Sequence, residues 1–141
     1  MIDLAQVRRE VGQIVDEVGE DYVYQSSDEG GGCYNVRFDQ EHRKWVGDCL
    51  IGRWIVRFLK IDPNLLADNV RGSGLPGVLA HLCSREYLPG DFEISIRACE
   101  WLSRVQTAQD ERVPWGACMQ RADEYNWEGI PDDQAYGLLV S

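Results

Sequence analysis

The chain is organised around one stretch, Asp48-Cys-Leu-Ile-Gly-Arg-Trp-Ile-Val-Arg-Phe-Leu59, which is apolar at most positions. Its cationic residues Arg53 and Arg57, with Lys60 just beyond the stretch, recur at helical spacing and form a single polar stripe. A run with helical rather than alternating polarity predicts a core helix that is buried on its other sides. Asp48 is placed to cap the first turn of this helix. We therefore expect the rest of the chain to pack around it.

Three further segments show the periodicity of amphipathic helices, and each begins or ends at a typical signal. Gly19 is placed to end the first, Asp91 to cap the second, and Pro114 to begin the third, which should run to about Tyr125. Two shorter helices are expected over 62–68 and 75–82. The apolar positions of the three long segments are Leu4, Val7, Val11, Ile14, Val15 and Val18; Ile94, Ala98, Trp101, Leu102 and Val105; and Trp115, Cys118, Met119 and Ala122.

Strand signals are confined to the region before the central helix. Residues 22–25 and 33–38 are rich in aromatic and β-branched residues, and a glycine-rich linker, 26–32, separates them. This order predicts a β-hairpin with a long turn, and Trp45 and Val46 offer a third strand. The fold class is therefore α+β, mainly α. We expect an N-terminal amphipathic helix, a small antiparallel β-hairpin or three-stranded sheet, and a compact helical core.

Length and composition predict one globular domain over residues 1–141, with an acidic C-terminal tail, 126–141, that either docks or stays mobile. The longest apolar run is too short to cross a bilayer, so no membrane association is expected. The N-terminus lacks the charged-then-apolar order of a signal peptide, which predicts a cytoplasmic protein.

The net charge of −10 is concentrated at the two ends of the chain. Residues 1–32 carry eight acids and two bases, and residues 110–141 carry seven acids and two bases, whereas the middle is nearly neutral. This distribution disfavours direct binding to nucleic acid or anionic membranes, because both are bound mainly through Lys and Arg. It favours a basic protein partner, or mimicry of nucleic acid to block a DNA- or RNA-binding protein.

No catalytic or cofactor-binding motif is present, so we predict no cofactor and no metal. The five cysteines are widely spaced and odd in number, which predicts free thiols. A small enzyme or metal protein that uses Cys33 and His42, with Cys49 and His81 as further metal ligands, is the alternative. It requires the fold to bring these residues together.

Candidate partner contacts lie near the acidic C-terminal end. Trp127 and Tyr125 are aromatic residues of the kind found at interface hot spots, and Asp132 and Asp133 follow closely. Trp115, which directly follows a proline, is expected in the core instead.

Three motifs resemble those of small conserved proteins from bacteriophages and prophages of actinobacteria. They are Tyr22-Val-Tyr with the glycine-rich loop and Cys33-Tyr34, then Cys49-Leu-Ile-Gly-Arg53, and Gln106-Thr-Ala-Gln-Asp110 followed by Pro-Trp115-Gly-Ala117. Glu111-Arg112 departs from the small residues usual after Gln-Asp in this family, and the long acidic tail is also peculiar to this chain. The motifs span residues 22–118.

The resemblance implies no enzymatic activity. It implies an accessory phage protein that acts in the host cytoplasm by binding and modulating a host or phage protein, here through acidic surfaces. The nucleic-acid mimic and the small enzyme or metal protein remain the alternatives.

Overall fold

The computed structural model describes residues 1–25, 35–69 and 74–138. Its helices are α1 (Leu4–Val18), α2 (Leu50–Phe58), α3 (Pro63–Asn69), α4 (Leu75–Ser84), α5 (Ile96–Asp110) and α6 (Trp115–Asp123). Its strands are β1 (Val36–Asp39) and β2 (Lys44–Gly47), which pair as an antiparallel hairpin. The prediction of an α+β fold that is mainly α is thus confirmed. None of the described helices is long and apolar enough to cross a membrane.

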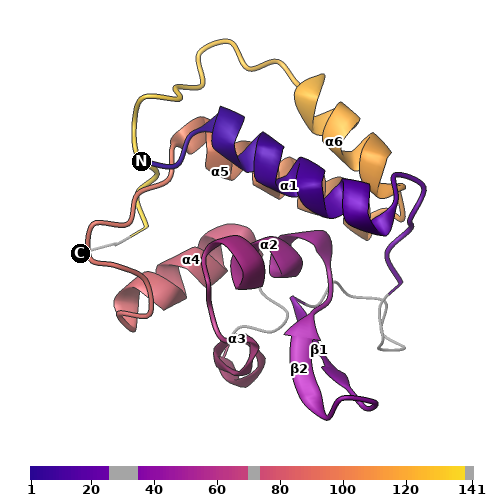
Figure 1. Ribbon diagram of the computed structural model, residues 1–141. Helices are drawn as coiled ribbons and strands as arrows, with labels where there is room; N and C mark the ends of the chain where they lie inside the picture. The colour runs from indigo at the N-terminus through magenta and orange to yellow at the C-terminus, as the bar shows by residue number, and fades with distance from the viewer. Residues whose placement is uncertain (26–34, 70–73, 139–141) are drawn as a thin grey trace.

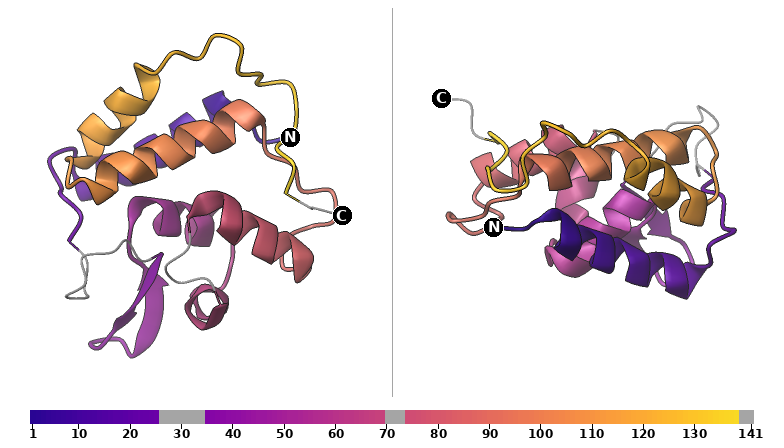
Figure 2. Two further views of the ribbon diagram at one scale, coloured as in Figure 1. Left: turned by 180° about the vertical axis from the view of Figure 1, so that it is seen from behind. Right: turned by 90° about the horizontal axis from the view of Figure 1, so that it is seen from above.

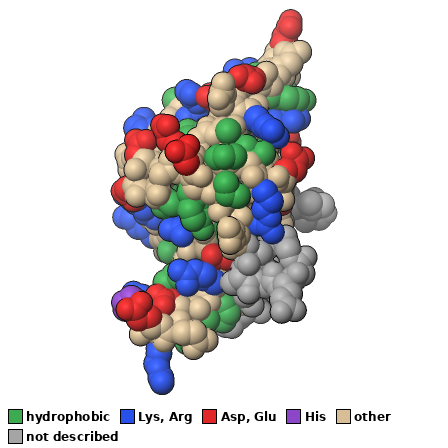
Figure 3. Space-filling view, turned by 90° about the vertical axis from the view of Figure 1, so that its right-hand side faces the viewer, with side chains coloured by type: hydrophobic (Ala, Val, Ile, Leu, Met, Phe, Trp, Pro, Cys, Tyr) green, Lys and Arg blue, Asp and Glu red, His purple; other side chains and the backbone are tan. Residues whose placement is uncertain are grey.

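The helices form an upper and a lower layer, and α2 lies between the upper layer and the hairpin (Figure 1). Helices α1, α5 and α6 pack together above α2 and α4, while α3 and the hairpin lie below. The hairpin forms a narrow extension of the molecule that carries charged side chains of both signs (Figure 3). The predicted core helix is confirmed, since Leu50, Ile51, Trp54 and Ile55 of α2 are fully buried.

Buried tryptophans tie neighbouring helices together through polar as well as apolar contacts. The indole N–H of Trp54 in α2 donates to Glu10 of α1 at 3.0 Å. That of Trp101 in α5 donates to Asp123 at the end of α6, 2.9 Å away. Trp115 is fully buried, as expected from its position after a proline. Each ring therefore removes a large apolar surface from water at a contact between helices.

The predicted pairing of the hairpin is wrong. Strand β1 pairs with residues 44–47, not with residues 22–25, and the register places Phe38 opposite Trp45. The backbone of residues 20–22 is used differently, because Glu20 and Tyr22 accept the N–H groups of Gly116 and Trp115 at the start of α6. Those N–H groups have no partner within α6. The glycine-rich linker and Cys33 lie outside the described residues.

Two predicted helix caps are also wrong. Asp48 is buried and accepts the Tyr24 hydroxyl, so the cap of α2 is Cys49, whose Sγ accepts the N–H of Gly52. Helix α5 begins not at Asp91 but after Ser95, whose hydroxyl accepts the N–H of Ala98. It starts late because the preceding residues pair with both ends of the chain.

These pairings bring the two termini to one side of the molecule (Figure 2). The N-terminal residue Ile2 pairs with Ile94, and Ala135 of the tail pairs with Ser95 on the other side. The described tail, 126–138, leaves α6, runs across the end of α5 and ends beside the connector between α4 and α5. It is therefore packed against the domain up to Leu138, which is buried.

Candidate functional site

Two of the residues expected to contact a partner, Tyr125 and Trp127, lie just after α6 and contact each other. Their rings meet edge to face, with 5.1 Å between centroids. Tyr125 is 38% exposed, and the guanidinium of Arg104 lies 3.1 Å from its ring centroid. Trp127 is half-buried and donates its indole N–H to the carbonyl of Ala122 at 3.0 Å. Tyr125 is thus accessible surface, whereas Trp127 anchors the start of the tail.

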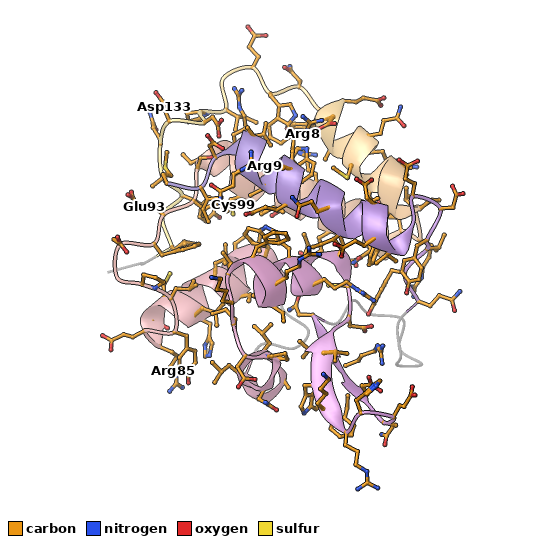
Figure 4. The ribbon with its side chains drawn as sticks, viewed as in Figure 1. Arg8, Arg9, Arg85, Glu93, Cys99 and Asp133 are labelled. Carbon is orange, nitrogen blue, oxygen red and sulfur yellow. The ribbon has the colours of Figure 1, made fainter. Side chains whose placement is uncertain are left out.

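The other two expected contacts, Asp132 and Asp133, differ sharply from each other. Asp132 accepts the backbone N–H of Leu4 at 3.0 Å and the Ser95 hydroxyl at 2.6 Å. One carboxylate therefore fastens the tail to the N-terminal ends of both α1 and α5, where negative charge is favourable. Asp133 is exposed at the edge of the molecule (Figure 4). Partner binding by these four residues stays a prediction.

The alternative site built on Cys33 and His42 cannot be assembled from the described residues, because Cys33 lies outside them. His42 is exposed at the hairpin turn, Cys49 is buried at the start of α2, and His81 is half-buried in α4. In the part of the chain that the structure describes, no group of three close ligand atoms contains two of these residues.

A different group of potential ligands lies at the hairpin turn, where Asp39, Glu41 and His42 place their ligand atoms within 4.8 Å of one another. His42 Nδ1 is 2.8 Å from Asp39, and this hydrogen bond lowers the pKa of the Asp39 carboxyl below its usual value. Asp39 also accepts the backbone N–H of Glu41, at 3.0 Å. These hydrogen bonds close the hairpin turn, and they explain why the three side chains lie close together.

Three of the described thiols, Cys49, Cys99 and Cys118, are buried, and Cys83 is partly exposed. Burial raises the pKa of Cys99 and of Cys118 to about 12, and it also raises the pKa of Cys83. A thiol with such a pKa is protonated at neutral pH and is a poor nucleophile. Cys49 is fully buried, and its Sγ lies 3.7 Å from Asn35 Oδ1. Cys49, Cys99 and Cys118 therefore act as small core side chains.

We expect iodoacetamide at pH 8 to leave Cys99 and Cys118 unmodified in the folded protein, because about one thiol in 10⁴ is ionised when its pKa is 12. Both should react fully in urea. Peptide mass spectrometry reads each site separately, and the partly exposed Cys83 provides the internal comparison. Modification of Cys99 in the folded state at the rate of a free thiol would contradict the packing described here.

Buried polar groups gather at the start of α2. Asp48, which is 4% exposed, accepts the Tyr24 hydroxyl at 2.7 Å and lies 3.4 Å from the guanidinium of Arg37. Gln109 of α5 accepts the N–H of Leu50 at 2.7 Å. The cluster joins the hairpin, α2 and α5 around the buried carboxylate of Asp48. We interpret it as a structural network.

A groove of about 710 Å³ lies between the end of α4, the connector 85–95 and the tail. We call this feature the tail groove. Leu88 and Leu138 are buried and Phe92 is half-buried in it, so its base is apolar. Burial, together with the charge on Glu100, raises the pKa of Tyr136, which also lines the groove. Cys83 contributes a partly exposed thiol.

The rim of the tail groove is acidic. Glu86 and Glu93 line it and are exposed, and Asp91 lies between them in the connector. The described residues provide no ion-pair partner for any of these three carboxylates. Arg85, at the end of α4, is the one cation in the connector, and it lies below Glu93 on the same side of the molecule (Figure 4). The groove thus offers an apolar base and unneutralised negative charge.

Sequence reasoning did not find this groove, although the sequence contains the turn residues Pro89-Gly90 and the acids Glu86, Asp91 and Glu93 around them. The groove exists only because the tail lies beside the connector, and no local pattern predicts that contact.

Comparisons with models of known protein families, with curated proteins and with solved structures found no match to this chain. The resemblance to phage proteins therefore stays a prediction.

Proposed function

We propose that this protein is a non-enzymatic accessory protein that binds a basic region of another protein through the tail groove. One observation carries the proposal. Glu86 and Glu93 stand unpaired at the rim of a large groove whose base is apolar. A cationic side chain would gain a carboxylate partner there, and its neighbours could bury apolar surface.

The charge of the protein supports the same partner chemistry. The connector carries three acids and one arginine, and the whole chain has a net charge of −10. Such a field attracts a basic partner and speeds encounter at low ionic strength. The exposed carboxylates add steering and specificity more than affinity, so the apolar base must supply much of the binding energy.

A binding role also agrees with the state of the thiols, since Cys99 and Cys118 are buried and protonated at neutral pH. The resemblance to phage proteins supports a host or phage protein as the partner and the host cytoplasm as the place of action. Binding would then modulate that partner.

Affinity capture from an actinobacterial lysate tests the proposal. We expect the protein to retain a stoichiometric basic partner at about 50 mM salt and to lose most of it by about 300 mM, as screening weakens exposed charges. The double variant Glu86→Lys and Glu93→Lys should retain at most about one tenth as much. The double variant Glu128→Lys and Asp133→Lys, which reverses two exposed tail carboxylates outside the groove, is the matched control.

Equal retention by the groove variant and the control would overturn the proposal, as would the absence of any salt-sensitive partner from a folded sample. Adding duplex DNA to the same lysate tests the alternative of nucleic-acid mimicry. A mimic competes with DNA for its partner, so its retained partner should fall as DNA is added.

A further inference from the structure

The tail groove contains a free strand edge. The N–H of Tyr136 donates to Ile94 at 2.8 Å and the N–H of Ile96 donates to Gln134 at 2.9 Å, as in an antiparallel pair. Backbone groups alternate in direction along a strand, so those of Ala135, between the two bonded residues, point away from this pair. Ala135 and Gly137 are exposed and line the groove, and neither has a backbone hydrogen bond to any described residue.

We propose that the tail groove binds an extended basic segment of a partner protein as an added β-strand, paired with Ala135 and Gly137. This inference rests on the proposed function and specifies how its partner is bound. A free edge in a groove can recognise a peptide by main-chain hydrogen bonds, while pockets beside it select alternate side chains.

The surroundings of the edge define the chemistry of the segment. On a strand added beside the tail, one set of alternate side chains faces the apolar base formed by Leu88, Phe92 and Leu138. The other set faces the open rim, where long Lys or Arg side chains reach Glu86 and Glu93. The segment therefore alternates apolar and basic residues, and its backbone is extended.

The position of the edge explains why it is available. Ile94 and Ser95 form the middle of a small three-segment arrangement, because Ile2 pairs on one side and the tail pairs on the other. The tail is the outer segment on the side where the connector rises to meet α5 (Figures 1 and 2). A strand added at the outer edge of the tail would leave the pairing of residues 94–96 intact.

Backbone N-methylation of a synthetic peptide tests strand addition directly. The parent probe is acetyl-Lys-Leu-Lys-Leu-Lys-amide, titrated into the full-length protein by calorimetry at about 50 mM salt. Two analogues are N-methylated, one on the leucines and the other on the internal lysine. The backbone amides of the leucines and those of the lysines point to opposite edges of the bound strand, so only one set faces the tail. We therefore expect one analogue to bind about tenfold or more weaker than the parent, and the other to bind within about threefold of it.

Amide hydrogen exchange provides the second readout. The parent peptide should slow exchange of the Ala135 and Gly137 amides about tenfold or more. The amide of Tyr136, already bonded to Ile94, should change little and serves as the internal control. The double variant Glu86→Gln and Glu93→Gln should weaken the peptide about fivefold, whereas Glu128→Gln should leave its affinity within about twofold.

Each other outcome overturns strand addition. If the parent and both methylated peptides bind equally, recognition is electrostatic only, and the proposed function stands without this mode. If the parent peptide does not bind, the groove does not take such a segment, and the capture experiment decides the proposed function separately. If amide exchange at Ala135 and Gly137 slows when the protein concentration is raised without any peptide, a second copy of the chain occupies the edge.

Discussion

Replacing Gly52 by alanine is expected to lower the free energy of unfolding by at least about 3 kcal/mol. Gly52 lies in the first turn of α2, where that helix meets the backbone just before β1. A Cβ atom at this position would lie 1.8 Å from the carbonyl oxygen of Asn35 and 2.5 Å from its carbonyl carbon. Backbone atoms cannot move aside as a flexible side chain can. The hairpin and α2 would have to separate.

The direction of this effect is the reverse of what helix propensity predicts, since alanine stabilises a helix interior by about 1 kcal/mol relative to glycine. Gly12→Ala in α1 is the matched control. A Cβ atom there meets only Met119 Cε at 3.7 Å, an ordinary contact, so this variant should be neutral or slightly more stable. Urea unfolding followed by tryptophan fluorescence measures both. Similar midpoints for the two variants would refute the close approach of Gly52 to Asn35.

The helices could be predicted from the sequence because each one carries its signal locally. The apolar residues of 48–59 recur at helical spacing, and α2 occupies most of that stretch. The same holds for α1, which begins after its cap Asp3 and ends before Gly19 as its pattern indicates. A helix satisfies its backbone within itself, so a single segment contains most of the information needed.

The hairpin partner could not be predicted in the same way. Residues 22–25 have the composition of a strand, but Tyr24 is buried with its hydroxyl on Asp48, and Tyr22 accepts an N–H from α6. Strand composition reports burial and shape rather than pairing. The choice between residues 22–25 and 44–47 as the partner of β1 depends on contacts distant in sequence.

The candidate site could not be predicted from the sequence, for a related reason. Tyr125, Trp127, Asp132 and Asp133 were selected as a partner surface because the tail is acidic and aromatic. The structure shows that Trp127 and Asp132 hold the tail to the domain. The accessible features, Ala135 and Gly137 at the strand edge, carry no distinctive side chain, so no composition signal marks them.

Asp132→Ala is expected to destabilise the protein by about 2 kcal/mol, because one carboxylate holds three segments together. It accepts hydrogen bonds from Leu4 in α1 and from Ser95 at the cap of α5. Both would lose a charged acceptor in the variant. Asp132→Asn keeps an oxygen acceptor without the charge and should cost about half as much. Urea unfolding measures both variants.

The neighbouring residue provides the control, since Asp133 is exposed and makes no hydrogen bond or ion pair with the described residues. Asp133→Ala should change stability by less than about 0.5 kcal/mol. Asp132 also lies two residues before Gln134, where the tail begins to pair with residues 94–96, so its loss should speed exchange of the Tyr136 and Ile96 amides more than that of amides within α2. Uniform acceleration throughout the protein would indicate that Asp132 stabilises the whole domain without specifically holding the tail. A local effect would make this carboxylate the anchor that keeps one wall of the tail groove in place.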